Sequence, residues 1–207
     1  KRLALNILCL TGVKPALILL GFMLASFMLS MWISNTATVM MMIPIVLSII
    51  KQLEEYLSEK STSRFSIGLL LGIAYSASVG GIATLVGTPP NLSLVRIFHI
   101  YFPNMPDISF SSWLIFALPV SAILFGATWL LLYLSFRPKK GEWVSIEKDT
   151  FHKHIIGIGN AKYEEKWVFV IFVLLAVLWI FRADLTLGSV TMKGWGSLFS
   201  NSSFIND

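Results

Sequence analysis

Two long uncharged runs dominate the pattern of hydrophobic and polar positions along this chain. The first covers residues 15–50, between two lysines, and the second covers residues 66–95. Small polar residues interrupt each run once, at Ser34-Asn35-Thr36 and at Gly87-Thr88-Pro89-Pro90-Asn91. A polar group without a partner in hydrocarbon costs roughly 2 to 7 kcal/mol, so each interruption must be compensated. We expect either helix capping or a bound polar ligand to do so.

The first run predicts a re-entrant hairpin over residues 15–50. Its first arm, residues 16–33, reaches roughly 27 Å at about 1.5 Å per residue. Its second arm, residues 37–50, contains Pro44. That arm reaches only about 21 Å, short of the roughly 30 Å hydrocarbon core. A hairpin that enters and leaves on one side, with the polar tripeptide at its tip, satisfies both lengths.

The second run predicts a broken transmembrane helix over residues 66–100. One continuous helix would be about 52 Å long, too long for one crossing and too short for two with a turn. Paired prolines cannot continue a helix, whereas Pro is favoured in the first turn of a new one. We expect a helix over 66–85, an unwound bridge, and a short helix over 91–100. The residues that support this break are Gly80, Gly81, Pro89, Pro90 and Asn91.

The distribution of charge predicts the topology of the remaining segments. The loop over residues 101–112 has no Lys or Arg, whereas residues 137–166 hold seven. By the positive-inside rule the first loop is external and the second is cytoplasmic. The other segments are a cytoplasmic approach over 1–14, a charged cytoplasmic connection over 51–65, transmembrane helices over 113–136 and 167–182, and a truncated tail over 183–207.

Composition agrees with an all-α, multi-pass protein of a lipid bilayer. The chain has 207 residues, of which 56% are hydrophobic and 13% charged, whereas soluble domains are about 25% charged. The net charge of +5 lies in particular loops and does not indicate a nucleic-acid partner. The chain begins at Lys1 without a signal-peptide pattern, which predicts a fragment. The lone Cys9 excludes an internal disulfide.

The two interruptions share a neutral chemistry of hydroxyls, amides and exposed backbone. Carbonyl groups at a helix C-terminus attract a cation, and N–H groups at a helix N-terminus attract an anion. Discontinuous helices that use both ends are typical of secondary transporters. We expect the first arm to end at Ser34 and the second to begin near Thr36, and the broken helix to repeat this arrangement from Gly87 to Asn91. Ser30 lies one turn before Ser34, so the predicted alkali-cation ligands are Ser30, Ser34, Asn35 and Gly87.

Other interpretations of the same residues remain open at this point. Ser34-Asn35-Thr36 is also a favourable N-cap between two helices, and capping and binding can coexist. Thr84 is interpreted as a helix-packing hydroxyl. An enzyme needs a nucleophile with a base, and the apolar runs contain no His, Asp or Glu to act as one. An ion channel also uses carbonyls and hydroxyls, and a non-transporting membrane subunit would need neither break.

The two motifs together resemble the divalent anion/sodium symporter family. The stretch from Gly21 to Ala37 and the stretch Gly80 to Asn91 carry this resemblance, which covers roughly residues 1–182. The family carries dicarboxylates such as succinate, tricarboxylates such as citrate, and sulfate. The resemblance implies a sodium site at Ser30, Ser34, Asn35 and Gly87, and substrate contacts from Asn35, Thr36 and Thr88.

The resemblance also implies what is missing from this chain. The family has two inverted repeats, each with its own Ser-Asn-Thr, and this sequence contains the tripeptide once. We therefore expect one partial repeat that does not transport alone and that forms a homodimer at full length. The function expected is sodium-coupled symport of a divalent anion in the cell membrane, with sodium as coupling ion and no cofactor. A sodium-independent dicarboxylate exchanger is the nearest alternative.

Overall fold

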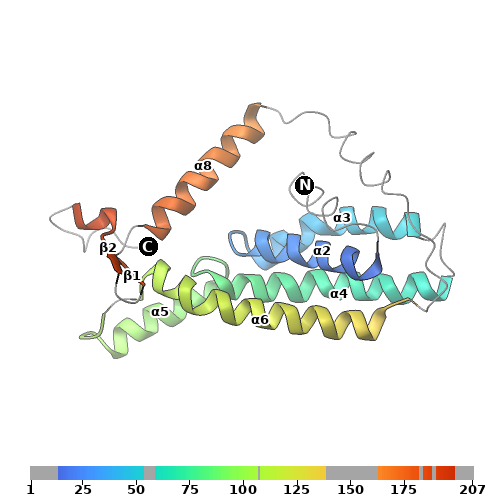
Figure 1. Cartoon of the computed structure of the whole chain (residues 1–207), viewed down its shortest axis with the longest axis horizontal. Helices are drawn as coiled ribbons and strands as arrows, with labels where there is room; N and C mark the ends of the chain where they lie inside the picture. The colour runs from blue at the N-terminus through green and yellow to red at the C-terminus, as the bar shows by residue number, and fades with distance from the viewer. Residues whose placement is uncertain are drawn as a thin grey trace.

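A computed structural model describes residues 14–53, 59–106, 108–138, 163–181, 184–187 and 190–198, and this part of the chain is mostly helical (Figure 1). Several predicted features lie outside these residues. They are Cys9, nearly all of the approach over 1–14, part of the connection over 51–65, most of the cytoplasmic loop over 137–166, and the end of the tail over 183–207.

The helices are α2 (Pro15–Ser30), α3 (Asn35–Leu53), α4 (Glu59–Ala83), α5 (Pro89–Tyr101), α6 (Phe110–Phe136) and α8 (Tyr163–Ile180). Within the described residues, Thr62–Ala83 and Phe110–Phe136 are long and apolar enough to cross a membrane. The apolar helices Pro15–Ser30 and Asn35–Lys51 are shorter. The prediction of a helical membrane protein agrees with these lengths and compositions.

The hairpin α2–α3 differs from its prediction at both ends. Helix α2 starts with Pro at its first turn, which is favoured there, and it ends at Ser30 instead of Ser34. Helix α3 runs past Ile50 to Leu53, because Lys51 and Gln52 are good helix formers. Its 19 residues reach about 28 Å at 1.5 Å per residue. Its apolar part, Asn35–Lys51, is nevertheless shorter than the helices that are long enough to cross a membrane, in agreement with the prediction of a short second arm.

Helix α4 ends at Ala83 and α5 begins at Pro89, so the second uncharged run is broken at residues 84–88. The backbone of Thr88 is extended, with φ −148° and ψ 142°. A residue before proline is disfavoured in the helical region, which accounts for that conformation. The break lies where paired prolines predicted it, two residues earlier than expected on its N-terminal side.

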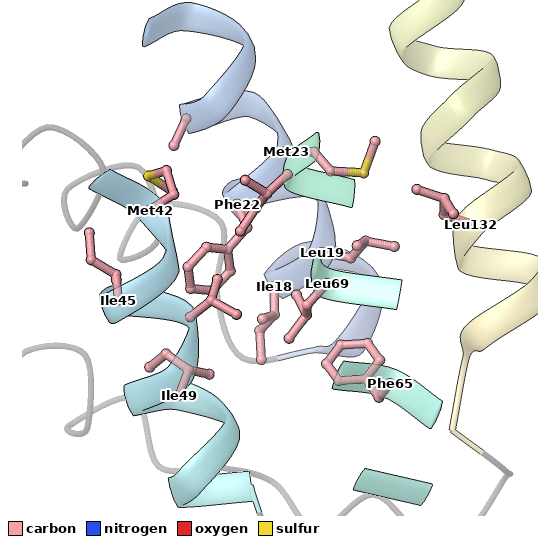
Figure 2. Packing of buried hydrophobic residues seen from close by; sticks show 13 residues of the cluster. Ile18, Leu19, Phe22, Met23, Met42, Ile45, Ile49, Phe65, Leu69 and Leu132 are labelled. Atoms are coloured by element: carbon pink, nitrogen blue, oxygen red, sulfur yellow. The ribbon is translucent and has the colours of Figure 1, made fainter. Parts of the chain in front are cut away.

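Helix α4 lies at the centre of the packing and contacts α2, α3 and α6 (Figure 1). Figure 2 shows side chains from all four helices meeting in one cluster. Phe22 of α2, Met42 of α3 and Leu69 of α4 are fully buried there, and Leu132 of α6 is 2% exposed. Close van der Waals contact of this kind is the main source of helix association in lipid.

Small residues on α4 allow its neighbours to approach closely. A Cβ atom on Gly68 would lie 2.7 Å from Cβ of Phe136, and one on Gly72 would lie 3.0 Å from side-chain atoms of Leu19 and Met23. At Gly80 the obstacle would be the backbone of Phe27, whose Cα atom would be 2.9 Å away. These glycines therefore allow close contact of α4 with α6 at Gly68 and with α2 at Gly72 and Gly80.

Two side chains tie the helix ends together at one end of the bundle. Arg64 of α4 donates from Nε and Nη2 to the Ser135 carbonyl oxygen, at 3.1 and 2.5 Å. The Trp129 indole of α6 donates to the Ala16 carbonyl oxygen at 3.2 Å. The beginnings of α2 and α4 therefore lie beside the end of α6, so α6 runs antiparallel to both.

Helix α8 lies apart from the bundle in Figure 1 and contacts α6. It is followed by an antiparallel ribbon of β1 (Leu185–Leu187) and β2 (Val190–Met192), in which Thr186 pairs with Thr191. A 3-10 turn, η1 (Trp195–Leu198), follows the ribbon. The indole of Trp195 donates to the Leu178 carbonyl oxygen at 2.7 Å. This small strand pair is an addition to the all-helical prediction.

Candidate functional site

The two predicted interruptions meet at the turn between α2 and α3 and the break between α4 and α5. The Thr84 hydroxyl donates a buried hydrogen bond to the Met31 carbonyl oxygen, so the end of α4 is joined to the end of α2. Ring contacts support the same turn. Trp32 stacks on Phe110 with ring centroids 6.1 Å apart, and Phe27 meets Phe125 edge-on at 5.1 Å. Residues about fifty positions apart therefore form one polar cluster.

Ser30 and Asn35 form the centre of this cluster. The Ser30 side chain is fully buried, and its hydroxyl donates to Asn35 Oδ1 at 2.7 Å. Because the proton points to Asn35, the lone pairs of the Ser30 oxygen remain able to accept. The sequence predicted that Ser30 lies one helical turn before Ser34 on the same helix. This is wrong, because α2 ends at Ser30. The tertiary structure brings Ser30 to Asn35 across the turn instead.

Gly87 lies against the backbone of both breaks. A Cβ atom there would be 2.6 Å from the Gly81 carbonyl oxygen and 3.0 Å from the Ser30 carbonyl oxygen. Gly81 is equally crowded, because its Cβ atom would lie 2.5 Å from Asn35 Oδ1. Both positions need glycine for the close approach. Oxygen atoms of three residues, Ser30, Asn35 and Gly81, consequently gather beside two glycines.

Ser34 has a different environment from the other predicted cation ligands. Its hydroxyl accepts from the backbone N–H of Ala37 at 3.3 Å, and its carbonyl oxygen accepts from Thr38 at 3.0 Å. This is the geometry of an N-cap residue, so the capping interpretation of the tripeptide holds for Ser34. Ser34 is also exposed, whereas Ser30 is fully buried. Its part in a cation site stays a prediction.

Thr36 and Thr88, the predicted substrate contacts along with Asn35, lie at the first turns of α3 and α5. Thr36 is exposed and Thr88 is partly buried. Thr88 is the N-cap of α5, but its side chain makes no capping hydrogen bond. The hydroxyl of Thr88 is therefore not used by its own helix.

The beginning of α5 differs from its prediction as an anion site. Pro89 and Pro90 occupy its first positions and have no N–H to donate. The next backbone N–H, of Asn91, donates to the Thr88 carbonyl oxygen at 3.1 Å. The expectation that α5 repeats the N–H donors of α3 is wrong for these residues. The Thr88 side chain and the first turn of α3 remain as candidate donors for an anion.

Asn91, predicted only to support the break, makes the most hydrogen bonds across it. Its Nδ2 donates to the Gly81 carbonyl oxygen at 2.9 Å and to the Thr84 carbonyl oxygen at 2.8 Å. Trp113 was not predicted, and its indole donates to the neighbouring Ile82 carbonyl oxygen at 3.0 Å. No short-range sequence signal links Trp113 to Ile82, because the contact depends on how α6 packs on α4.

Comparison with known proteins relates this chain to a transporter family. Residues 1–193 match the citrate transporter family. The sodium-dependent dicarboxylate transporter SdcS of Staphylococcus aureus, in strains NCTC 8325 / PS 47 and COL, is 42% identical over 187 residues, which are 87% of this chain and 35% of the relative. The chain thus spans about a third of the length of these curated relatives. The resemblance carried by the two motifs is confirmed, and the chain belongs to the citrate transporter family.

Proposed function

We propose that this chain forms one half of the binding site of a sodium-coupled symporter for a divalent anion, with a dicarboxylate as the preferred substrate. The observation that carries the proposal is the gathering of neutral oxygen atoms beside Gly87, between two helix breaks. The relatives, whose name describes sodium-dependent dicarboxylate transport, support the same function. The full-length protein is then a multi-pass protein of the cell membrane that works as a homodimer.

Sodium is held in this proposal by oxygen atoms of both breaks. The Ser30 hydroxyl and Asn35 Oδ1 are 2.7 Å apart, and the Ser30 and Gly81 carbonyl oxygens flank Gly87. Unwound backbone carbonyls and helix ends coordinate Na⁺ in transporters of this kind. The Gly87 carbonyl completes the predicted set. Ser34, its remaining member, already accepts hydrogen bonds from α3 with both of its oxygen atoms.

The anion is held in this proposal by groups at the first turns of α3 and α5. The Thr88 hydroxyl makes no capping hydrogen bond to α5, and Thr36 is exposed in the first turn of α3. The first turn of a helix favours a carboxylate through its N–H groups and its dipole. Asn35 takes part in both sites, since its Oδ1 atom lies beside Ser30 and its backbone begins α3. Sodium binding would thereby order the residue that the anion also needs.

The hairpin α2–α3 is re-entrant in this proposal. Figure 1 supports this arrangement, because α5 continues beyond the turn of the hairpin in the direction of α4. The turn would then lie within the thickness of the membrane. Irregular backbone at that depth is tolerated where protein surrounds it, as the contacts of Trp32 with Phe110 and of Thr84 with Met31 provide here.

The test is uptake of labelled succinate into liposomes that contain the full-length protein, with and without a sodium gradient. Ser30→Ala and Asn35→Ala are compared with Ser78→Ala, whose exposed hydroxyl bonds only to Ala74 of its own helix. We expect sodium-dependent uptake to fall at least about tenfold in the first two variants, because each loses an oxygen of the cation site. Ser78→Ala should transport normally.

Unlabelled sulfate and citrate, added as competitors, identify the preferred anion. Uptake that ignores sodium but is accelerated by an internal dicarboxylate would instead establish an exchanger. Normal uptake by both Ser30→Ala and Asn35→Ala would leave the tripeptide as a helix cap and remove the proposed cation site.

A further inference from the structure

Asn91 and Thr84 are not among the proposed ligands of sodium or the anion. Their side chains connect the beginning of α5, the end of α4 and the end of α2. Both residues are buried: Thr84 is fully buried and Asn91 is 7% exposed. Asn91 uses its amide nitrogen for the Gly81 and Thr84 carbonyl oxygens, at 2.9 and 2.8 Å. It therefore satisfies the Gly81 carbonyl group in the last turn of α4. It also gives a second donor to the Thr84 carbonyl group, which accepts from the Gly87 N–H at 3.4 Å.

Thr84 extends these contacts to the hairpin. Its carbonyl oxygen accepts from Asn91, and its hydroxyl donates to the Met31 carbonyl oxygen. Met31 directly follows Ser30, the buried serine that bonds Asn35. Thr84 thus accepts a hydrogen bond from α5 and donates another to the end of α2.

These contacts close a ring around Gly87. From Ser30 the ring passes through Asn35 to Gly81, whose Cα region is packed against Asn35 Oδ1. From Gly81 it passes through Asn91 and Thr84 to Met31, and so returns to Ser30. The Gly81 and Ser30 carbonyl oxygens, which a Cβ atom on Gly87 would approach to 2.6 and 3.0 Å, both belong to residues of this ring.

We propose that Asn91 and Thr84 are positioning residues that set the separation of the Gly81 and Ser30 carbonyl oxygens, and thereby the sodium affinity of the site. This inference rests on the proposed function, because it concerns the same cation site. Neither side chain contacts the ion. The hydroxyl of Thr84 fixes α2 to α4, and the amide of Asn91 fixes the turn of α4 that bears Gly81.

A purely structural role makes a different prediction. If the ring only stabilised the fold, its loss would lower the amount of active protein and the maximal rate, with the sodium requirement unchanged. If the ring positions the cation ligands, its loss raises the sodium concentration needed for half-maximal uptake, and high sodium restores the rate. Succinate KM at saturating sodium would then stay within about twofold of the wild-type value.

The experiment measures succinate uptake by the full-length protein in liposomes over a range of sodium concentrations. Thr84→Val keeps the volume of the side chain and removes the hydroxyl, and Asn91→Leu does the same for the amide. We expect each to raise the half-saturating sodium concentration about tenfold, because a buried hydrogen bond is lost. Thr84→Ser keeps the hydroxyl and should restore the wild-type value.

Thr128→Val is the matched control. It makes the same change on α6, where the Thr128 hydroxyl bonds to Leu124 of its own helix at 2.7 Å, and its sodium dependence should equal that of the wild type. An unchanged half-saturating concentration in Thr84→Val and Asn91→Leu would overturn the inference. So would failure of both to reach the membrane while Thr84→Ser and Thr128→Val succeed, since the role would then be structural. Wild-type uptake without sodium dependence would instead overturn the proposed function itself.

Discussion

At the scale of single residues, the candidate site depends on positions where a side chain is absent. Gly81 and Gly87 bring backbone and amide oxygens close together because neither has a Cβ atom. Gly81 lies in the last turn of α4 and Gly87 lies within the break, so both segments can approach the hairpin turn. Short polar side chains can then contact one another directly, as in the 2.7 Å hydrogen bond of Ser30 with Asn35.

Gly87→Ala should abolish most sodium-dependent uptake. The added methyl group would lie 2.6 Å from the Gly81 carbonyl oxygen and 3.0 Å from the Ser30 carbonyl oxygen, and backbone atoms cannot rotate away as a flexible side chain can. Overpacking of this kind typically costs about 1–3 kcal/mol, which predicts a loss of about fivefold to more than a hundredfold. The measurement is sodium-dependent succinate uptake by the full-length protein.

Gly126→Ala is the matched control, because a Cβ atom there would meet nothing within 4 Å. It should transport at the wild-type rate. Equal, unimpaired uptake in both variants would show that the Gly87 backbone is not part of a crowded site.

At the scale of secondary-structure elements, α4 organises the bundle. Its glycines let α2 and α6 approach on different sides, and its end supplies carbonyl groups to Asn91 and Trp113. The uncharged runs predicted α2 to α5 in the right order. The element ends were less predictable, because Lys51 was interpreted as the end of a membrane arm and instead continues α3.

Gly80→Ala should loosen the contact between α2 and α4. Its Cβ atom would collide with the backbone of Phe27, so the two helices must separate. We expect a loss of about 1–3 kcal/mol in stability, seen as a lower midpoint of thermal unfolding for the detergent-purified full-length protein. Ser78→Ala, on the exposed side of the same helix, should leave the midpoint unchanged. An unaltered midpoint in Gly80→Ala would show that α2 and α4 can accommodate a methyl group between Gly80 and the Phe27 backbone.

At the scale of the whole molecule, basic residues gather at one end of the bundle. Lys14 precedes α2, Lys51 lies at the end of α3, Arg64 lies early in α4 and Arg137 follows α6. The contacts of Arg64 with Ser135 and of Trp129 with Ala16 place these helix ends together. By the positive-inside rule we expect this end to be cytoplasmic, although α5 carries Arg96 beyond the break.

Single cysteines should report this orientation in a cysteine-free full-length protein. Met105→Cys lies in the loop before α6, where Met105 is 57% exposed, and Arg137→Cys lies just after α6. In intact cells a membrane-impermeant maleimide should label Met105→Cys, and it should label Arg137→Cys only after permeabilisation. The reversed pattern would show that the basic end faces outward.

The sequence by itself determined the class of the protein, the order of its main helices and the location of both breaks. These properties follow from local chemistry, since the absence of charge sets the apolar helices and paired prolines must begin a new one. The pairing of the two motifs also identified the family. Ser30, Asn35 and Gly87 of the candidate site were predicted from the sequence, and the structure places them side by side.

Only the tertiary structure decided which polar groups meet. Ser34 and Ser30 are four positions apart, yet one caps α3 at the surface and the other is buried against Asn35, because α2 ends between them. The contacts of Thr84 with Met31, of Asn91 with Gly81 and of Trp113 with Ile82 depend on how helices cross. Helix crossing is set by packing between residues far apart in the chain, and local sequence patterns do not specify that packing.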